Sequence, residues 1–282
     1  LGMQDASPHV QQLIGRVPPF ELVQRAADWL REAGIVNLNI DLMYGLPGKS
    51  VRDVARSAEL AASLNPQRLA LFGYAHVPWF KTHQKLIDDA ALPGLAERLE
   101  QAQVASETLE SLGYEAVGLD HFALPADELC VATRERRLRR NFQGYTTDDA
   151  DALIGLGASA IGRLPQGFVQ NAPDLAGYSR AIAAGRLATV KGLTLSADDR
   201  LRGEIIERLM CDLELDLDKF GGGAASFAAE IKALAPLAEQ GLLRIEGSRI
   251  TVTPSGRPYV RIAAAAFDTY LAASQKRHSV AV

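Results

Sequence analysis

Residues 36–48 constrain the fold most strongly, because they describe a strand that runs into a tight loop. Aliphatic residues alternate along it with mostly polar ones. The aliphatic positions are Val36, Leu38, Ile40 and Leu42, and the others are Asn37, Asn39, Asp41 and Met43. This period of two predicts one face packed under a helix and one face that meets water, a ligand or hydrogen-bond partners.

Asp41 lies near the expected carboxyl end of this strand, just before Gly45-Leu-Pro-Gly48. Ligands bind at that end of the strands in parallel α/β folds. A buried Asp that ties down the following loop is an equally good interpretation, since an unpaired carboxylate in a dry core costs several kcal/mol. The pattern alone leaves both roles open.

Strands and helices alternate along the first 124 residues. The expected helices are 21–33, 51–64 and 95–112, and the strands after the central one are 68–75 and 115–119. Such alternation predicts an α/β fold with a parallel sheet and right-handed crossovers. A closed eight-strand barrel needs ~250 residues, so we expect only about half of a barrel.

The pattern changes after residue 124, which divides the chain into expected domains 1–124 and 125–282. In the second, we expect helices at 126–138, 148–156, 197–213, 224–240 and 255–273, a strand at 158–163, and a hairpin of 242–245 and 249–252. Two helices, a hairpin and a helix form a winged-helix-like pattern, so this domain should be mainly helical.

Composition excludes several classes of function. The net charge of −4 gives no support for binding to nucleic acid, and no apolar run approaches the ~20 residues of a membrane span. Cys130 and Cys211 fit a reducing cytoplasm as inert buried thiols, and no cysteine or histidine spacing predicts a metal site. The opening residues, Leu-Gly-Met-Gln-Asp, read as a strand already under way, so we expect the chain to begin inside a longer protein.

Polar residues follow the expected strands at four points. They are Gln4-Asp5, Asp41 with Tyr44, Tyr74 with His76, and Asp120-His121. Each alone is typical of structural residues, but together they predict a shared site where the strands end. The arginines of residues 134–140 are interpreted mainly as a solvated helix face paired with Glu128 and Glu135, with one or two left as candidates to bind substrate carboxylates.

Several motifs carry a resemblance to a known family. Asn39-Ile-Asp-Leu-Met-Tyr-Gly-Leu-Pro-Gly48 resembles the hallmark of radical S-adenosylmethionine enzymes of the oxygen-independent coproporphyrinogen III oxidase group, which a branch of heme chaperones shares. Four later motifs resemble the oxidase branch. They are Tyr74-Ala-His-Val-Pro78, Gly118-Leu-Asp-His-Phe-Ala123, Asp127-Glu-Leu129 and Arg140-Asn-Phe-Gln-Gly-Tyr-Thr-Thr147.

The resemblance implies the carboxyl-terminal half of an open radical-enzyme (β/α) barrel, followed by a helical substrate-covering domain. It implies oxidative decarboxylation of two propionates of coproporphyrinogen III to vinyl groups, which gives protoporphyrinogen IX in heme biosynthesis. A [4Fe-4S] cluster cleaves S-adenosylmethionine, and the 5′-deoxyadenosyl radical takes hydrogen from each propionate. The family also suggests a monomer, and the sequence does not identify its electron donor or acceptor.

The family binds two S-adenosylmethionine molecules. Its contact positions match Gln4, Arg16, Asp41 and Ala75 for one molecule and Ile161 for the other, and Phe142 and Gln143 are expected near the same cavity. No residue is assigned as catalytic.

Two departures accompany the resemblance. The family's Cys-x-x-x-Cys-x-x-Cys motif would precede residue 1, so the cluster ligands are expected outside this chain and the chain alone should not turn over. Ala6 stands where the family has an aromatic residue. The alternative function is a heme-binding relative of the chaperone branch, with His76, His83 or His121 as ligands.

Overall fold

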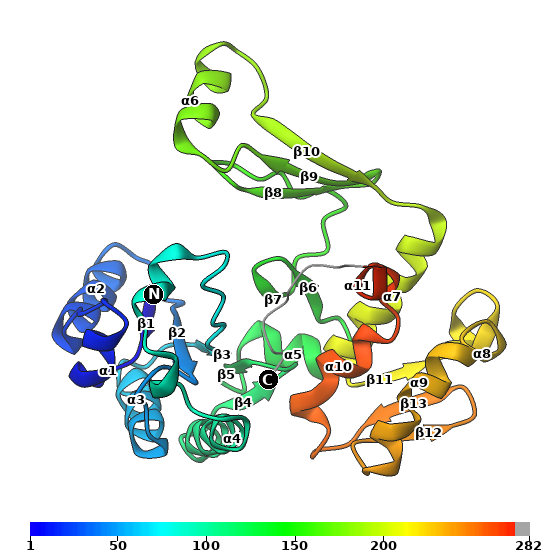
Figure 1. Cartoon of the computed structure of the whole chain (residues 1–282), viewed down its shortest axis with the longest axis horizontal. Helices are drawn as coiled ribbons and strands as arrows, with labels where there is room; N and C mark the ends of the chain where they lie inside the picture. Colours follow the sequence, from blue (N-terminus) through cyan, green and yellow to red (C-terminus); the bar gives the residue numbers. More distant parts are fainter. Residues whose placement is uncertain (274–282) are drawn as a thin grey trace.

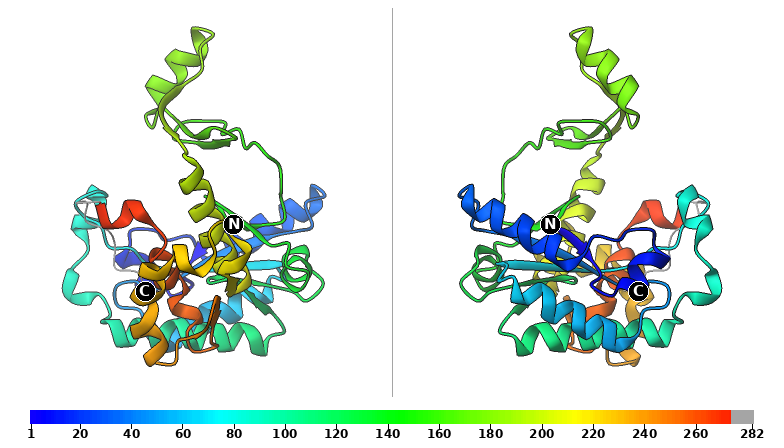
Figure 2. Two further views of the ribbon diagram at one scale, coloured as in Figure 1. Left: turned by 90° about the vertical axis from the view of Figure 1, so that its right-hand side faces the viewer. Right: turned by 90° about the vertical axis from the view of Figure 1, so that its left-hand side faces the viewer.

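The computed structural model describes residues 1–273. A five-stranded sheet with helices on one face occupies one side of the molecule, a second group of helices and small sheets lies beside it, and a long arm projects from the top (Figures 1 and 2). Residues 274–282, the end of the second predicted domain, lie outside the described residues.

The first sheet has the strand order β1-β2-β3-β5-β4. Strands β1 to β3 are parallel, as predicted, and β5 is antiparallel to both of its neighbours. The strands are β1 (Gly2–Gln4), β2 (Asn39–Tyr44), β3 (Arg68–Gly73), β4 (Glu115–Val117) and β5 (His121–Ala123). The prediction of an all-parallel sheet is therefore wrong at one edge, because the unpredicted β5 folds back beside β3 and carries β4 outward.

The helices of this half lie where the sequence predicts them. They are α1 (Pro8–Leu13), α2 (Phe20–Glu32), α3 (Val51–Ser63) and α4 (Leu95–Ser111), with the short 3₁₀ helices η1 (Thr82–Leu86) and η2 (Asp89–Ala91) between β3 and α4. Ser50 is the N-cap of α3, and its hydroxyl accepts a hydrogen bond from the Asp53 N–H at 3.2 Å.

The alternating pattern of β2 works as predicted. Ile40 and Leu42 are buried in a core with Val54, Ala58 and Leu109, which come from α3 and α4. Asn39, Asp41 and Met43 therefore face the opposite side of the sheet, away from these helices.

The chain after residue 124 contains more strands than predicted. The strands here are β6 (Arg139–Asn141), β7 (Gly144–Thr146), β8 (Ile161–Leu164), β9 (Gly167–Asn171), β10 (Thr189–Thr194), β11 (Glu214–Asp216), β12 (Leu243–Glu246) and β13 (Arg249–Val252), of which β8 overlaps the predicted strand 158–163. Strands β8 to β10 form the sheet of the arm, which α6 (Leu175–Ala183) extends (Figure 1). The predicted hairpin is β12 and β13.

Three helix predictions in this part need correction. Helix α5 covers only Glu128–Arg134, and residues 148–156 form no helix. Leu153 instead exchanges two backbone hydrogen bonds with Arg163, at 2.7 and 2.9 Å, so the arm satisfies backbone groups that a helix would have paired internally. The predicted helix 255–273 is not continuous, because it is interrupted near Pro258 and Asp268.

The remaining helices surround a second core. They are α7 (Ala197–Asp212), η3 (Leu217–Lys219), α8 (Gly223–Ser226), α9 (Ala228–Glu239), η4 (Arg257–Tyr259), α10 (Val260–Ala265) and α11 (Thr269–Ala273). Leu209, Ile250 and Phe267 are buried at its centre. Across residues 1–273, no helix is both long enough and apolar enough to cross a membrane.

Candidate functional site

Three of the predicted cofactor residues, Gln4, Arg16 and Asp41, lie together around Gly2. Gly2 is the register partner of Asp41, and its carbonyl accepts a 3.1 Å hydrogen bond from Nη2 of Arg16. A Cβ atom on Gly2 would lie 2.6 Å from Nε2 of Gln4 and 3.2 Å from Nη2 of Arg16. The side chains of Gln4 and Arg16 therefore both approach Gly2, and a larger residue there would displace them.

The cluster of Gln4, Arg16 and Asp41 contains polar atoms that can still form hydrogen bonds. The Oε1 atom of Gln4 is buried and has no hydrogen-bond partner in the described part of the chain. Gln4 also has a φ of 56°, which costs a non-glycine residue roughly 1–3 kcal/mol and is typical of functional sites. Oδ1 of Asp41 accepts a 2.7 Å hydrogen bond from Asn39, and Arg16 is exposed without an ion pair within residues 1–273.

Asp41 lies in the middle of β2, not near its carboxyl end as the sequence suggested. The strand starts at Asn39 and continues to Tyr44, so its true end is three residues farther along. Asp41 is half-buried on the face away from the helices. Its carboxylate therefore lies on the open side of the sheet, where its described hydrogen bond is with Asn39.

Asp5 has the structural role instead. Its buried carboxylate forms an ion pair with Lys49, and Lys49 Nζ donates a 2.6 Å hydrogen bond to the Met43 carbonyl. Burial lowers the pKa of Lys49, an effect that the charge of Asp5 opposes. Gln101 completes the arrangement by accepting from the Gly45 N–H at 2.8 Å and donating to the Lys49 carbonyl at 2.7 Å. The loop between β2 and α3 is therefore held rigidly beside Gln4.

Ala75 is exposed just beyond β3, and its carbonyl accepts a 3.1 Å hydrogen bond from Gln84. It lines a cavity of about 860 Å³ together with Tyr44, Tyr74 and Asp120. Three of the four predicted polar clusters thus contribute to one cavity, whereas Gln4 and Asp41 do not line it. The predicted convergence of the four clusters is only partial.

The histidines near the strand ends already have partners. His76 lies 3.3 Å from the Tyr74 hydroxyl and 2.8 Å from the Asp89 carboxylate. His121 contacts the Asp120 carboxylate at 2.7 Å and packs edge-on against Tyr145. Among residues 1–273, no three histidine, cysteine or acidic side chains are grouped as metal ligands. Two of the three candidate heme ligands, His76 and His121, thus already contact carboxylates of this chain.

The arginine run is mostly paired, although not as predicted. Glu135 pairs with Arg137, but Glu128 has no such role. The other pairs are Arg134 with Glu115 at 2.9 Å, Arg136 with Glu214 at 3.2 Å, and Arg139 with Glu207 at 3.4 Å. Arg140 differs, because its buried Nε has no partner in the described chain and its guanidinium lies 5.6 Å from the Tyr145 ring centre.

Phe142 and Gln143 form the turn between β6 and β7. The exposed Phe142 ring packs edge-on against Phe168 of the arm at 5.3 Å, and Arg140 and Phe142 line a cavity of about 700 Å³ at the base of the arm. Gln143 donates its backbone N–H to Asn141 and has an exposed side chain. Ile161 begins β8. No described hydrogen bond, ion pair or ring contact joins these residues to Gln4, Arg16 or Asp41.

Sequence reasoning missed the side chains that enclose the 860 Å³ cavity from the second half of the chain. Arg257, Tyr259 and Arg261 line it, more than 130 residues beyond Asp120. No local pattern marks them, because they approach β3 only when the second core docks. Arg98 was also missed. It lies 5.9 Å from the Tyr44 ring centre and donates a 2.9 Å hydrogen bond to the Tyr74 carbonyl.

Comparison with known proteins gives a consistent result. Residues 195–259 match the family model described as the HemN C-terminal domain. The chain is 46% identical to "Oxygen-independent coproporphyrinogen III oxidase" of Bradyrhizobium diazoefficiens, over 100% of this chain and 64% of that protein. It is 43% identical to the protein of the same name from Paracoccus denitrificans, over 100% of this chain and 63% of that one.

A solved structure is similar as well. It is described as "Coproporphyrinogen III oxidase (HemN) from Escherichia coli is a Radical SAM enzyme", and it matches with a TM-score of 0.87 and 38% identity. The match covers 95% of this chain and 63% of that one. The chain thus spans a little under two thirds of the length of these relatives.

Proposed function

We propose a function for this chain on the basis that it belongs to the family of oxygen-independent coproporphyrinogen III oxidases. The proposed reaction converts two propionates of coproporphyrinogen III to vinyl groups. Each propionate loses a hydrogen atom, carbon dioxide and one electron, and the electron passes to an acceptor outside this chain. The proposed activity is that of the longer protein of which the chain would be the carboxyl-terminal part.

The observation that carries the proposal is the unpartnered Oε1 of Gln4 beside Arg16 and Asp41. S-adenosylmethionine has an amino acid end with an ammonium and a carboxylate. The carbonyl of Gln4 and the carboxylate of Asp41 are suited to accept hydrogen bonds from the ammonium. The guanidinium of Arg16 is suited to the carboxylate, since it matches that group with two parallel hydrogen bonds. Ala75 would add a backbone contact.

The second proposed set is Ile161, Phe142, Gln143 and Arg140. We assign Ile161 to a second S-adenosylmethionine and Phe142 and Gln143 to the wall of the same cavity. Arg140 is the arginine of the run best suited to a substrate propionate, because its Nε is buried without a partner and it lines the cavity beside Phe142. The remaining members of the run are held by glutamates.

The radical chemistry would be supplied by the cofactors and not by the side chains of this chain. A [4Fe-4S] cluster with ligands outside this chain, together with S-adenosylmethionine, supplies the 5′-deoxyadenosyl radical. The residues of this chain would bind and orient the cofactor and the substrate. The proposed division into a barrel part, 1–124, and a substrate-covering part, 125–282, follows the change from the core around Ile40 to the core around Leu209.

Binding of S-adenosylmethionine to the chain of residues 1–282 tests the cofactor site by isothermal titration calorimetry. We expect Asp41→Asn and Arg16→Gln each to weaken the binding event at this site about tenfold and to leave any binding at the Ile161 site unchanged, since a hydrogen bond to a charged group contributes about 1.5–3 kcal/mol. Arg56→Gln is the matched control, because Arg56 is an exposed arginine paired only with Glu59 on α3. Equal binding by all variants would overturn the assignment.

The activity is tested separately on the complete product of the reading frame that contains Leu1. With S-adenosylmethionine, a reductant and coproporphyrinogen III under anaerobic conditions, we expect protoporphyrinogen IX, measured as fluorescent protoporphyrin after oxidation. Failure of the product to form with an intact cluster would overturn the proposed reaction. It would leave the calorimetric result on the cofactor site unaffected.

A further inference from the structure

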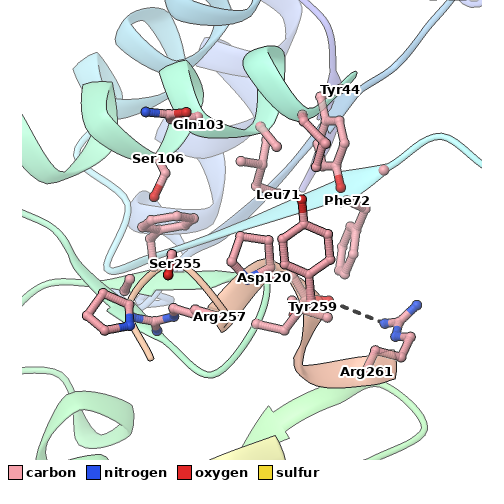
Figure 3. A pocket seen from close by; sticks show the side chains of 18 of the residues that line it. Tyr44, Leu71, Phe72, Gln103, Ser106, Asp120, Ser255, Arg257, Tyr259 and Arg261 are labelled. Atoms are coloured by element: carbon pink, nitrogen blue, oxygen red, sulfur yellow. Dashed lines mark ion pairs between the residues drawn. The ribbon is translucent and has the colours of Figure 1, made fainter. Parts of the chain in front are cut away.

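The cavity of about 860 Å³ lies between α4, the end of β3 and the segment 252–262 (Figure 3). Two of its lining residues, Leu71 and Phe122, belong to the core on the helix-covered side of the sheet. Asp41 faces the other side, and the cavity reaches the proposed cofactor residues only at Ala75. It is therefore largely separate from the site proposed above.

Arg257 is the unusual member of its lining. Its Nε donates a 2.7 Å hydrogen bond to the Gly118 carbonyl, and its two terminal nitrogens have no partner within the described chain. It forms no ion pair with a described acidic residue. Burial lowers its pKa, an effect that the charges of Tyr145 and Glu110 only partly oppose. A half-buried guanidinium without a counterion has lost hydration that nothing in the protein replaces.

The other charged groups of the cavity are less available. Arg261 lies 3.8 Å from the Asp120 carboxylate, which also contacts His121, and its side chain is exposed near the mouth (Figure 3). Glu107 and Glu110 line the α4 side and would repel an anion there, and the charge of Glu110 also acts on Arg257 without forming an ion pair with it. An anionic group is thus best placed at Arg257.

The rest of the wall suits an apolar body with a few polar atoms. Its apolar members include Leu71, Phe72, Leu99 and Ile262. The hydroxyls of Tyr44 and Tyr259 point into the same part of the cavity and have no hydrogen-bond partner in the described residues (Figure 3). Burial raises the pKa of Tyr44, so its hydroxyl stays protonated and can donate.

We propose that this cavity is a further binding site, in addition to the two proposed above, that takes an amphipathic organic carboxylate, with the carboxylate on Arg257 and the apolar body between α4 and segment 252–262. A guanidinium with two free terminal nitrogens matches a carboxylate in geometry as well as charge. The volume is in the range of small-molecule sites, and the mixture of apolar walls with a few convergent polar groups is typical of them.

The test uses the complete chain and the fluorescent probe 11-(dansylamino)undecanoate. We expect saturable binding with one site, which dodecanoate displaces and its uncharged methyl ester does not. Arg257→Gln should weaken binding about tenfold or more, because it removes the charge but keeps a polar side chain of similar reach. Arg249→Gln should bind like the wild type, since Arg249 is an exposed arginine of the same half that pairs with Glu214 outside the cavity.

Arg257→Gln also removes the hydrogen bond from Arg257 to the Gly118 carbonyl, which joins the second core to the five-stranded sheet. A second variant that keeps this hydrogen bond therefore tests the proposal independently. Ala102→Phe on α4 places a phenyl ring in the part of the cavity expected to hold the apolar body without altering Arg257, and it should weaken binding strongly while the thermal unfolding midpoint stays near that of the wild type. Absence of saturable binding, equal displacement by the methyl ester, or unchanged binding by Ala102→Phe would each overturn the proposal. Because no iron-sulfur cluster is needed, the result is independent of the proposed reaction.

Discussion

At the scale of single residues, the ion pair of Lys49 with Asp5 is the most consequential contact near the proposed cofactor site. Both side chains are almost fully buried, with exposed fractions of 1% and 0%. A buried pair is weak evidence for net stability, but removing one partner leaves an uncompensated charge. The pair therefore defines the position of Gln4 more than it stabilises the fold.

Lys49→Met should lower the free energy of unfolding by about 3–5 kcal/mol, because the Asp5 carboxylate would remain buried without its cation. Urea denaturation measures this change. Lys85→Met, at an exposed lysine, is the control and should change stability by less than about 0.5 kcal/mol. The double variant Asp5→Asn with Lys49→Met should recover part of the loss, and a cost no larger than that of the control would contradict the structural role.

The raised pKa values of the two cysteines predict how the free energy of unfolding depends on pH. Burial raises the pKa of Cys211 to about 12 and that of Cys130 to about 11, from the ordinary value of 9.0. Between pH 9 and 11 the unfolded chain loses these protons and the folded chain keeps them. The folded state is therefore favoured below pH 9 and loses stability as the pH rises.

We expect the free energy of unfolding to fall across this window and Cys211→Ala to reduce the fall by about 2 kcal/mol. Urea denaturation at pH 8, 9, 10 and 11 measures both slopes. Reaction of the native thiols with a thiol reagent at pH 8 should also be slow and become fast in urea. Parallel pH curves for the variant and the wild type would show that Cys211 does not titrate as described.

At the scale of elements, the turn between β4 and β5 joins the two halves of the molecule. The Tyr145 hydroxyl accepts a 2.9 Å hydrogen bond from the Leu119 N–H and donates a 3.0 Å hydrogen bond to the Met210 carbonyl of α7. Its ring packs directly on Gly118, where a Cβ atom would come within 2.0 Å of it. The turn needs a glycine for its φ of 56° and also for this close approach.

A comparison of Gly118 with Gly113 separates the need for a positive φ from the need for space beside Tyr145. Gly118 and Gly113 both have positive φ, but a Cβ on Gly113 would meet nothing within 4 Å. Gly113→Ala should therefore cost only the left-handed backbone penalty of about 1–2 kcal/mol, and Gly118→Ala should cost at least about 2 kcal/mol more through displacement of Tyr145. Thermal unfolding of the two variants gives the difference. Equal losses would mean that Tyr145 can move aside freely.

At the scale of the whole molecule, the arm stands apart from both cores (Figure 2). Strand β10 is exposed along its whole length, and no residue of α6 is buried. Large apolar side chains of the arm are highly exposed, with Leu187 at 87% and Leu175 at 73%. Few buried contacts hold this sheet, so it should open more easily than the five-stranded sheet.

Amide hydrogen exchange tests that expectation. Backbone amides of β8 to β10 should exchange at least tenfold faster than those of β2 and β3, because local opening of the arm leaves both cores intact. The comparison within one sample corrects for pH and temperature. Protection in the arm equal to that in β2 would indicate that the arm unfolds only together with the rest.

The sequence by itself determined the parts whose signals are local. Period-two alternation placed β2, and the alternation of strand and helix patterns along the first 124 residues placed α2, α3 and α4. The motifs around Asp41 and Phe142 also carried the resemblance to the oxidase family, because they reflect residue types at short spacing. Hydrogen bonds and burial within one element decide these features, so the pattern carries them without knowledge of the distant chain.

Only the tertiary structure decided what depends on distant partners. Strand β5 pairs with β3 across some fifty residues, and Leu153 is extended because Arg163 supplies its hydrogen bonds. No local pattern marks Lys49 as the buried partner of Asp5, and the hydrogen bond of Arg257 to Gly118 forms only when the second core docks. The free energies of such contacts depend on which side chains meet after folding, and that information is absent from any short stretch of sequence.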